Sequence, residues 1–245
     1  MRNIFFQIAL LACGFFFISS SGCDAVTAHK IQLVNDLGDT ITFEKTPRVA
    51  IITDFGDMII ELSDSTPAHR DNFLKLASDG FYDNLLFHRV INGFMIQGGD
   101  PKSKGAAPNA RLGDGGPGYT IPAEIRPDHL HTKGALAAAR QGDRVNPEKR
   151  SSGSQFYIVQ GKTWTDTELS QMEMRANAVA PSFKFSDENK EAYKTVGGTP
   201  FLDMNYTVFG HVVEGLDIID SIAKVQTLPG DRPEEDVKFS VEILK

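Results

Sequence analysis

The residues with the clearest chemical potential lie between positions 87 and 100. This stretch holds one arginine, Arg89, and one glutamine, Gln97, on either side of the apolar pair Phe94 and Met95. In two short strands broken by a glycine, alternate side chains share a face, so a guanidinium, an amide and an apolar wall can surround one shallow cleft. No nucleophile, metal-ligand cluster or phosphate-binding loop accompanies them. The pattern predicts a site that works by hydrogen bonding and apolar contact.

Taken singly, these residues also have simpler interpretations. Arg89 alone fits a surface ion-pair partner, and Phe94, Met95 and Phe201 alone fit a hydrophobic core. The interpretation as a cleft therefore depends on the other blocks of the chain and on their order.

The stretch from 87 to 100 resembles the signature of the cyclophilin family of peptidyl-prolyl isomerases. Further blocks similar to this family follow in order, and the resemblance covers residues 48–245. Each further block is moderately specific, whereas the order and spacing of all of them are highly specific. These further blocks are residues 134–140, 152–158, 201–203 and 206–210.

The resemblance implies a role for each matching residue. Arg89 matches the family's catalytic arginine, and Gln97 is assigned as the second catalytic residue, a polar anchor that holds the acyl side of the substrate. The implied substrate-binding positions are the proline-pocket residues Phe94, Met95, Tyr157, Phe201, Leu202 and Tyr206, the second polar anchor Gln155, and the groove residues Ala139 and Arg140.

Three pocket positions depart from the common family pattern. Tyr157 stands where many members have Phe, Phe201 where many eukaryotic members have Trp, and Tyr206 where they have His. The pocket stays aromatic, so the resemblance still implies isomerase activity. Because the family's Trp contributes to cyclosporin binding, we expect this chain to bind cyclosporin weakly.

The chemistry of the X–Pro bond explains why such a site needs no metal or cofactor. Resonance opposes rotation about the C–N bond with a barrier of about 18–20 kcal/mol, so the two isomers interchange slowly. When the bond twists, the prolyl nitrogen gains a lone pair. A donor aimed at that lone pair stabilises the twisted state more than either planar state. Arg89 suits this role because it stays protonated and has several donors.

Short apolar runs separated by glycine-rich turns predict a mainly β fold. Thr66 and Pro67 predict the start of a helix that ends at Gly80, and Leu216 and Ile219 belong to a second amphipathic helix. Many short strands with two flanking helices favour a closed antiparallel barrel, which the resemblance implies to be eight-stranded, although periodicity alone also fits a sandwich. The expected strands include a hairpin over residues 49–62 and strands near 94–98, 134–139, 155–160, 207–213 and 237–244.

Residues 161–198 form a charged segment with helical character. Thr165 and Glu168 can form a capping box, and Ser186 begins a second helical stretch. The segment has few large apolar residues, so we expect a helical insertion in the barrel without a core of its own.

The N-terminus differs from the rest of the chain. Residues 1–22 combine an early positive charge with an apolar run and small residues, which is typical of a secretory signal peptide, although a retained anchor helix fits the same pattern. Cys23 resembles the lipidated cysteine of bacterial lipoproteins, apart from Ser20 where that motif usually has Leu. We expect residues 23–47 to be a tether with a weak hairpin. The chain is then exported to the bacterial cell envelope or periplasm and anchored to a membrane through Cys23.

Composition narrows the functional class. A chain of 245 residues allows one sizeable core or two small ones, and a net charge of −7 without a basic run argues against general nucleic-acid binding. Once Cys13 leaves with the signal peptide, Cys23 is the remaining thiol, so no disulfide forms within the mature chain.

These observations favour an exported peptidyl-prolyl cis-trans isomerase of residues 48–245. We expect a monomer that accelerates folding of proline-containing polypeptides outside the cytoplasm. The alternative is a proline-peptide-binding chaperone or assembly factor of the envelope with little catalysis.

Three histidines outside the predicted pocket are assigned structural roles. His88 precedes Arg89, but the expected reaction moves no proton. His129 and His131, beside Asp128, have the spacing of a metal pair. No third ligand follows at a suitable spacing, so a loop with satisfied side chains is favoured over a metal site.

Overall fold

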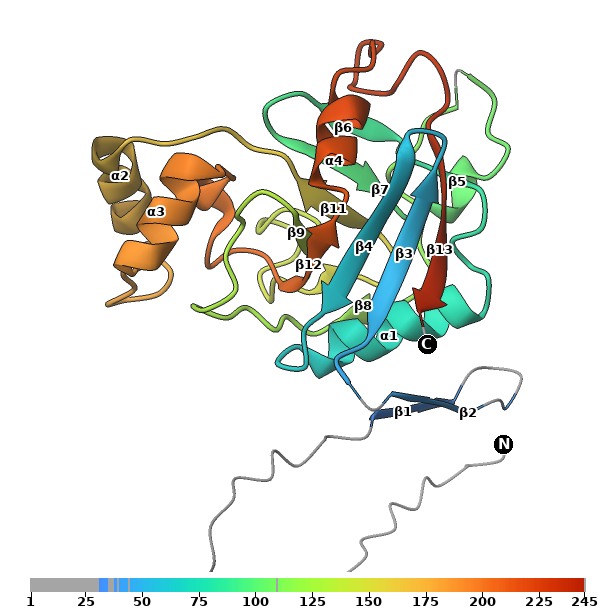
Figure 1. Cartoon of the computed structure of the whole chain (residues 1–245), viewed down its shortest axis with the longest axis horizontal. Coiled ribbons are helices and arrows are strands. Elements are labelled where there is room, and N and C mark those ends of the chain that lie inside the picture. Colours follow the sequence, from blue (N-terminus) through green and yellow to red (C-terminus); the bar gives the residue numbers. More distant parts are fainter. Residues whose placement is uncertain (1–30, 35–37, 39, 44, 109, 245) are drawn as a thin grey trace, which may run out of the picture.

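Alternating apolar residues build one curled antiparallel sheet, and the described residues also form four α-helices that lie against or beside it (Figure 1). The computed structural model describes residues 31–34, 38, 40–43, 45–108 and 110–244. The predicted signal peptide and Cys23 lie outside the described residues. Within the described part, no helix combines the length and the apolar character needed to cross a bilayer.

The main sheet has nine strands, and the expected strands are all found within one or two residues of the predicted bounds. In spatial order the strands are β5 (Leu85–Leu86), β13 (Lys238–Leu244), β3 (Arg48–Thr53), β4 (Gly56–Leu62), β12 (Val208–Glu214), β9 (Ala135–Ala138), β11 (Phe156–Val159), β7 (Met95–Gly98) and β6 (Arg89–Ile91).

The sheet is open, whereas we predicted a closed, eight-stranded barrel. The mainly β architecture is confirmed, but among the described residues no ladder joins the two edge strands β5 and β6. The loop after the last helix takes the place of the closing strand, since the backbone N–H of Val90 donates to the carbonyl of Asp231 at 2.8 Å. This contact covers part of the β6 edge, so fewer backbone N–H and C=O groups of that edge strand stay unpaired, as closure of the barrel would also achieve.

Two smaller ribbons accompany the main sheet. Strand β1 (Ile31–Val34) pairs with β2 (Thr40–Phe43), which confirms the N-terminal hairpin, and β8 (Thr120–Ile121) pairs with β10 (Ser151–Ser152). Phe43 is buried within the main hydrophobic cluster. The described part of the N-terminal extension therefore packs against the main body.

Helices α1 (Pro67–Ser78) and α4 (Leu216–Ala223) flank the sheet, as predicted. In Figure 1, α1 lies across the lower end of the sheet and α4 lies towards its upper end. Both bury apolar side chains in the main cluster, among them Phe73 and Leu74 of α1 and Ile219 and Ile222 of α4.

The N-terminus of α1 is capped differently from the prediction. Pro67 occupies the first turn as expected, but the side chain of Thr66 makes no capping hydrogen bond. Instead, the carboxylate of Glu124 accepts from the backbone N–H groups of Ala68 at 3.1 Å and His69 at 3.0 Å. The positive end of the helix dipole also stabilises an anion at this position. A residue distant in sequence therefore fixes where α1 begins.

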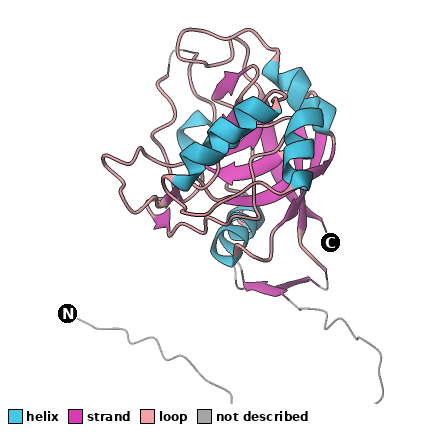
Figure 2. Cartoon of the chain, turned by 90° about the vertical axis from the view of Figure 1, so that its left-hand side faces the viewer, coloured by secondary structure: helices cyan, strands magenta, loops and turns pink. Residues whose placement is uncertain are grey.

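The insertion carries helices α2 (Asp166–Asn177) and α3 (Asp187–Thr195), with short 3-10 helices η1 (Pro101–Ser103) and η2 (Pro200–Leu202) elsewhere in the chain. Figure 2 faces this side of the molecule and shows the insertion's helices in front of the sheet. The predicted capping box of Thr165 and Glu168 is present, and Ser186 forms a second one with Asn189.

The insertion has its own apolar cluster, so the expectation that it lacks one was wrong. The residues are spread along the segment and converge only on folding, and Leu130 from the main body joins them. The buried members are Leu130, Leu169, Met172, Ala176, Phe183, Phe185 and Tyr193.

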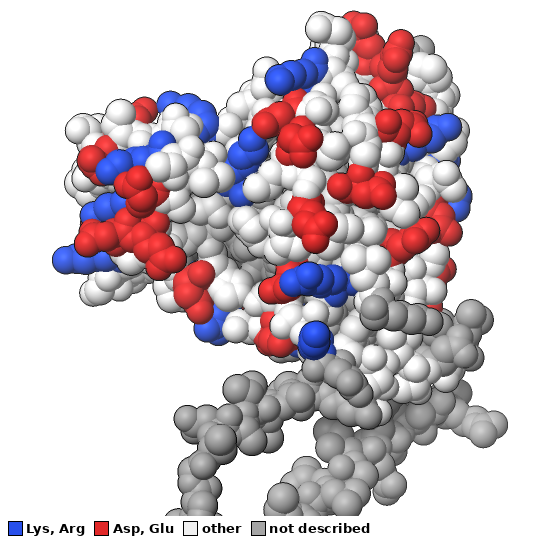
Figure 3. Space-filling view, viewed as in Figure 1, with Lys and Arg blue, Asp and Glu red and all other residues white. Residues whose placement is uncertain are grey.

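Strands β9 and β11 bury both of their faces, and β7 does so except at the half-buried Gln97. In β11, Phe156 and Ile158 enter the main cluster, whereas Tyr157 and Val159 enter a second cluster on the opposite face. The alternation of side chains along a strand explains this division. The second cluster contains most of the predicted pocket residues. Charged residues lie outside these clusters, and acidic and basic side chains are interspersed on the face shown in Figure 3.

Acid should destabilise the fold through histidines whose pKa is lowered by burial, among them His69 and His88. Burial lowers the pKa of His69, against the opposing effect of Glu124, and burial also lowers the pKa of His88. In the unfolded chain both return to about 6.5. Below that pH the unfolded chain binds more protons than the folded chain, so the free energy of unfolding falls as the pH falls. Urea unfolding followed by circular dichroism, at about pH 7.5 and about pH 5.5, measures this change.

A His88→Leu variant is the matched control, because it removes one of these histidines. Its unfolding free energy should depend less steeply on pH over the same interval. A wild-type chain that is equally stable or more stable at the acidic pH would contradict the assignment.

Candidate active site

Four neighbouring strands place the predicted residues in one row. Arg89 on β6 lies opposite Gln97 on β7, and Gln97 lies opposite Tyr157 on β11. Tyr157 in turn lies opposite Ala137 on β9. Residues that face each other across an antiparallel pair share one side of the sheet. A guanidinium, an amide and an aromatic ring are thus brought together on the face away from the main cluster.

A pocket of about 370 Å³ lies over this row. This volume suits a small apolar group such as a proline ring with its neighbouring backbone. The pocket takes in every predicted site residue of the described chain except Gln155 and Phe201, and it adds four that were not predicted. The lining residues are His88, Arg89, Phe94, Met95, Gln97, Leu112, Gly113, Ala139, Arg140, Tyr157, Leu202, Tyr206 and Gly230.

Arg89 is held at the pocket edge with part of its donor set unused. Its Nε donates to the carboxylate of Asp231 at 3.2 Å, and its Nη1 lies 3.5 Å from Oε1 of Gln97. Within the described residues, Nη2 has no protein acceptor. The side chain is 41% exposed, so the ion pair with Asp231 does not bury the guanidinium. Arg89 can therefore donate to a group that enters the pocket.

Gln155 supports the site from behind. Its Oε1 accepts from Nε2 of Gln97 at 3.1 Å, and its own Nε2 donates to the carbonyl of Gly115 at 2.7 Å. The side chain is buried and lines an adjacent groove rather than the pocket itself. The structure thus places Gln155 where it fixes the amide orientation of Gln97.

The turn that carries Phe94 is held by Gln160, which sequence reasoning missed. Oε1 of Gln160 accepts from the N–H of Gly93 at 2.6 Å, and the backbone N–H groups of Gln160 and Gly161 both donate to the carbonyl of Phe94. Nε2 of Gln160 donates to Asp220 on α4. A glutamine at the end of an apolar strand was the available signal, because a polar residue there needs a partner.

Ala139 and Arg140 differ in what their backbones can offer. The N–H and carbonyl of Ala139 are already bonded to Gln155 and Ser152. For Arg140, no backbone hydrogen bond is found in the described part of the chain. Its guanidinium is occupied, donating to the carbonyl of Asn205 at 2.9 Å and to Asp143 at 2.6 Å. The backbone of Arg140, rather than its side chain, is therefore free to pair with a bound peptide.

Phe201 lies on the rim and not in the pocket lining. The residue is 40% exposed, and its ring lies 5.6 Å from the ring of Phe94 and 6.1 Å from that of Trp164, measured between centroids. Leu202, the next residue in η2, lines the pocket. Phe201, which we predicted to line the proline pocket, therefore lies at its edge.

The four added lining residues come from loops, where no periodicity marks them. Gly113 is positioned by the fully buried carboxylate of Asp100, which accepts from its N–H at 2.6 Å and from the N–H of Gly115 at 3.2 Å. His88 is buried beside this loop, as expected for a structural histidine. Such long-range capping of a turn leaves no local sequence signal.

The two histidines with metal-like spacing have protein partners. His131 is fully buried, with Nδ1 2.9 Å from Asp203 and Nε2 3.0 Å from the hydroxyl of Tyr157. Nε2 of His129 lies 2.6 Å from the hydroxyl of Ser63. Their side chains point to different partners, and Nδ1 of His129 lies 3.1 Å from the carboxylate of Asp128.

A model of the family described as cyclophilin type peptidyl-prolyl cis-trans isomerase/CLD matches residues 48–242. The chain belongs to the cyclophilin family. Among its relatives, a peptidyl-prolyl cis-trans isomerase of Staphylococcus saprophyticus is 36% identical over 195 residues, which cover 79% of this cyclophilin and 89% of the relative. One from Staphylococcus aureus is 37% identical over 191 residues, covering 78% and 87%.

Solved structures agree with the family. A cyclophilin type peptidyl-prolyl cis-trans isomerase of Cryptosporidium parvum superposes with a TM-score of 0.58 at 25% identity, covering 81% of this chain and 98% of the other. A second structure of that protein, at 24% identity, was determined in the presence of the dipeptide Ala-Pro. This cyclophilin is a peptidyl-prolyl cis-trans isomerase.

Removing the support behind Gln97 should slow the isomerase. A Gln155→Leu substitution deletes the hydrogen bond that orients Gln97, which is worth about 1 kcal/mol, so kcat/KM for a proline peptide should fall about fivefold. Gln171→Leu on the exposed face of α2 is the matched control and should behave as wild type. Unchanged turnover in a folded Gln155→Leu protein would show that this support is not needed.

Proposed function

We propose that this cyclophilin binds X–Pro segments in the pocket around Met95, Tyr157 and Leu202 and accelerates their isomerisation through Arg89. The observation that carries the proposal is the partly unused guanidinium of Arg89 at the edge of an apolar pocket. The dipeptide Ala-Pro present with the solved relative supports proline-containing polypeptides as the substrate.

The role of each group follows from whether it can still bond to a substrate. The apolar and aromatic wall holds the proline ring, while the backbone of Arg140 and the amide of Gln97 hold the acyl side. One half of the substrate is fixed while the other half turns. As the C–N bond leaves the plane, the prolyl nitrogen becomes a hydrogen-bond acceptor, and Arg89 donates to it. This interaction forms only in the twisted state, so it lowers the barrier without tightening the ground state.

We also propose where this activity is used. The signal-like residues 1–22 and the lipobox-like Cys23 support export to the bacterial envelope and attachment to a membrane by lipid. The clients are then exported proteins whose folding is limited by X–Pro isomerisation. We expect the cyclophilin to act as a monomer and, since Phe201 replaces the family's Trp, to bind cyclosporin weakly.

A proline-limited refolding assay distinguishes an isomerase from a proline-peptide-binding chaperone. The wild-type protein should accelerate the slow phase of a reporter protein at substoichiometric amounts. Arg89→Ala should reduce this acceleration about 100-fold, the usual cost of removing one transition-state donor. Arg126→Ala is the matched control, because it removes an arginine from an exposed ion pair with Asp128, and it should match wild type.

Two results would oppose the proposal. Acceleration only at amounts that match the reporter would favour the binding alternative. Full acceleration by folded Arg89→Ala would remove Arg89 from the mechanism.

Mass spectrometry of the mature N-terminus tests the localisation. In a bacterial host the mature chain should begin at Cys23 with the mass of a diacylglycerol, and Cys23→Ser should release the protein from the membrane fraction. A mature chain that starts elsewhere, or that lacks lipid, would contradict the anchor and leave the isomerase assignment unaffected.

A further inference from the structure

We propose that the helical insertion positions the pocket through a buried chain of hydrogen bonds that runs from Tyr193 through Asp203 and His131 to Tyr157. The hydroxyl of Tyr193 donates to Oδ2 of Asp203 at 2.7 Å, and Nδ1 of His131 lies 2.9 Å from Oδ1. Nε2 of His131 lies 3.0 Å from the hydroxyl of Tyr157. All four side chains are more than nine-tenths buried.

The donors and acceptors in this chain fit one arrangement. The carboxylate of Asp203 can only accept, so Nδ1 of His131 carries a proton and donates. In the neutral ring Nε2 then accepts, and the hydroxyl of Tyr157 donates to it. Burial raises the pKa of Tyr157 and of Tyr193 well above the ordinary value, which keeps both hydroxyls protonated as donors. Asp203 also accepts from the backbone N–H of His131 at 2.9 Å.

Asp203 connects this chain to two walls of the pocket. It directly follows Leu202, which ends η2 and lines the pocket, and it holds the histidine that holds Tyr157. The ring of Tyr206, another lining residue, stands nearly perpendicular to the rings of both His131 and Tyr157. A shift of this carboxylate would therefore move several lining residues together.

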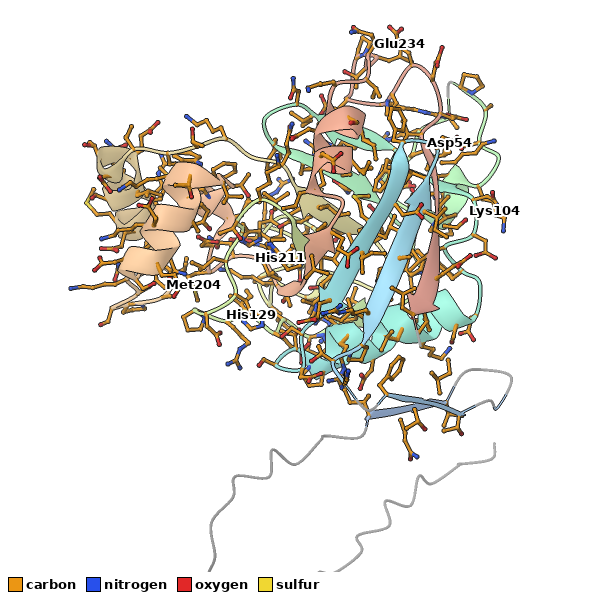
Figure 4. All side chains as sticks on the ribbon, in the orientation of Figure 1. Asp54, Lys104, His129, Met204, His211 and Glu234 are labelled. Carbon is orange, nitrogen blue, oxygen red and sulfur yellow. The ribbon has the colours of Figure 1, made fainter. Side chains whose placement is uncertain are left out.

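The insertion supplies the other end of the chain. Tyr193 belongs to α3 and packs edge-on against Phe185 within the insertion's own apolar cluster. Its carbonyl accepts from the N–H of Trp164, whose ring contacts Phe201 on the pocket rim. Met204, next to Asp203, packs against the same cluster and lies beside the insertion (Figure 4). The apolar cluster of the insertion thus packs against the segment from η2 to Met204.

Because the four side chains are buried, the loss of one hydrogen bond affects the whole chain of hydrogen bonds. A partly satisfied polar network in a low-dielectric interior is costly, whereas a complete one selects a single arrangement. Deleting the hydroxyl of Tyr193 leaves Oδ2 of Asp203 short of a partner, and the strain is transmitted through His131. A phenylalanine at position 157 has no hydroxyl to bond to His131, so a shift of His131 would not reach it through a hydrogen bond. We therefore assign Tyr193, Asp203 and His131 as positioning residues for the proline pocket.

A double-mutant cycle on Tyr193 and Tyr157 tests this inference, which rests on the proposed role of the pocket. Tyr193→Phe should raise KM for a proline peptide about fivefold with little change in kcat, because one hydrogen bond that orders the pocket is lost. In a Tyr157→Phe background the same substitution should raise KM clearly less, about twofold, because the link through His131 to Tyr157 is already broken and only the one through Leu202 remains.

Tyr82→Phe is the matched control. This tyrosine is equally buried, and its hydroxyl donates to the backbone carbonyl of Ser154. Neither residue belongs to the chain of hydrogen bonds from Tyr193 to Tyr157. It should lower the thermal unfolding midpoint to a similar degree as Tyr193→Phe but leave KM unchanged. The inference is overturned if Tyr193→Phe leaves KM unchanged, or if its effect is the same in both backgrounds.

A separate variant distinguishes failure of this inference from failure of the proposed function. Met95→Ala enlarges the pocket wall without touching the buried chain, and it should raise KM if the pocket binds proline. An unchanged KM for Met95→Ala would reject the pocket itself, whereas a raised KM together with an inert Tyr193→Phe would reject only the positioning role.

Discussion

The site depends on a guanidinium that is held in place but not fully used. A buried, unpaired charge is expensive, and a freely rotating arginine would lose entropy on binding substrate. Arg89 avoids both costs, because Asp231 and Gln97 fix its orientation while part of the side chain stays exposed. Prolyl isomerisation transfers no proton and no electron, so in the proposed mechanism the protein's contribution is the placement of one donor opposite an apolar wall.

The same sheet builds the core and the pocket. Because side chains alternate along β9 and β11, every residue that enters the main cluster is followed by one that enters or packs against the pocket cluster. A slip of one residue in register would exchange the two sets. The stability of the core therefore maintains the geometry of the site, and the row from Arg89 to Tyr157 is a consequence of strand pairing.

Sequence reasoning was most reliable where the signal is local. The strand positions, both flanking helices and most pocket residues were predictable from alternation and from the blocks shared with cyclophilins. The failures concern partners that are distant in sequence. Glu124 caps α1, the loop at Asp231 covers the β6 edge, and Leu130 joins the insertion's apolar cluster. No periodicity records such contacts, because folding alone brings these residues together.

The most direct measurement is nuclear magnetic resonance exchange spectroscopy on a proline peptide, which reports the affinity and the isomerisation rate in one sample. With Arg89→Ala, the peptide should bind with nearly the wild-type affinity while the cis-trans exchange on the protein slows about 100-fold. That result shows a donor that acts in the twisted state. A parallel loss of affinity with an unchanged rate in the bound peptide would show instead that Arg89 only holds the substrate.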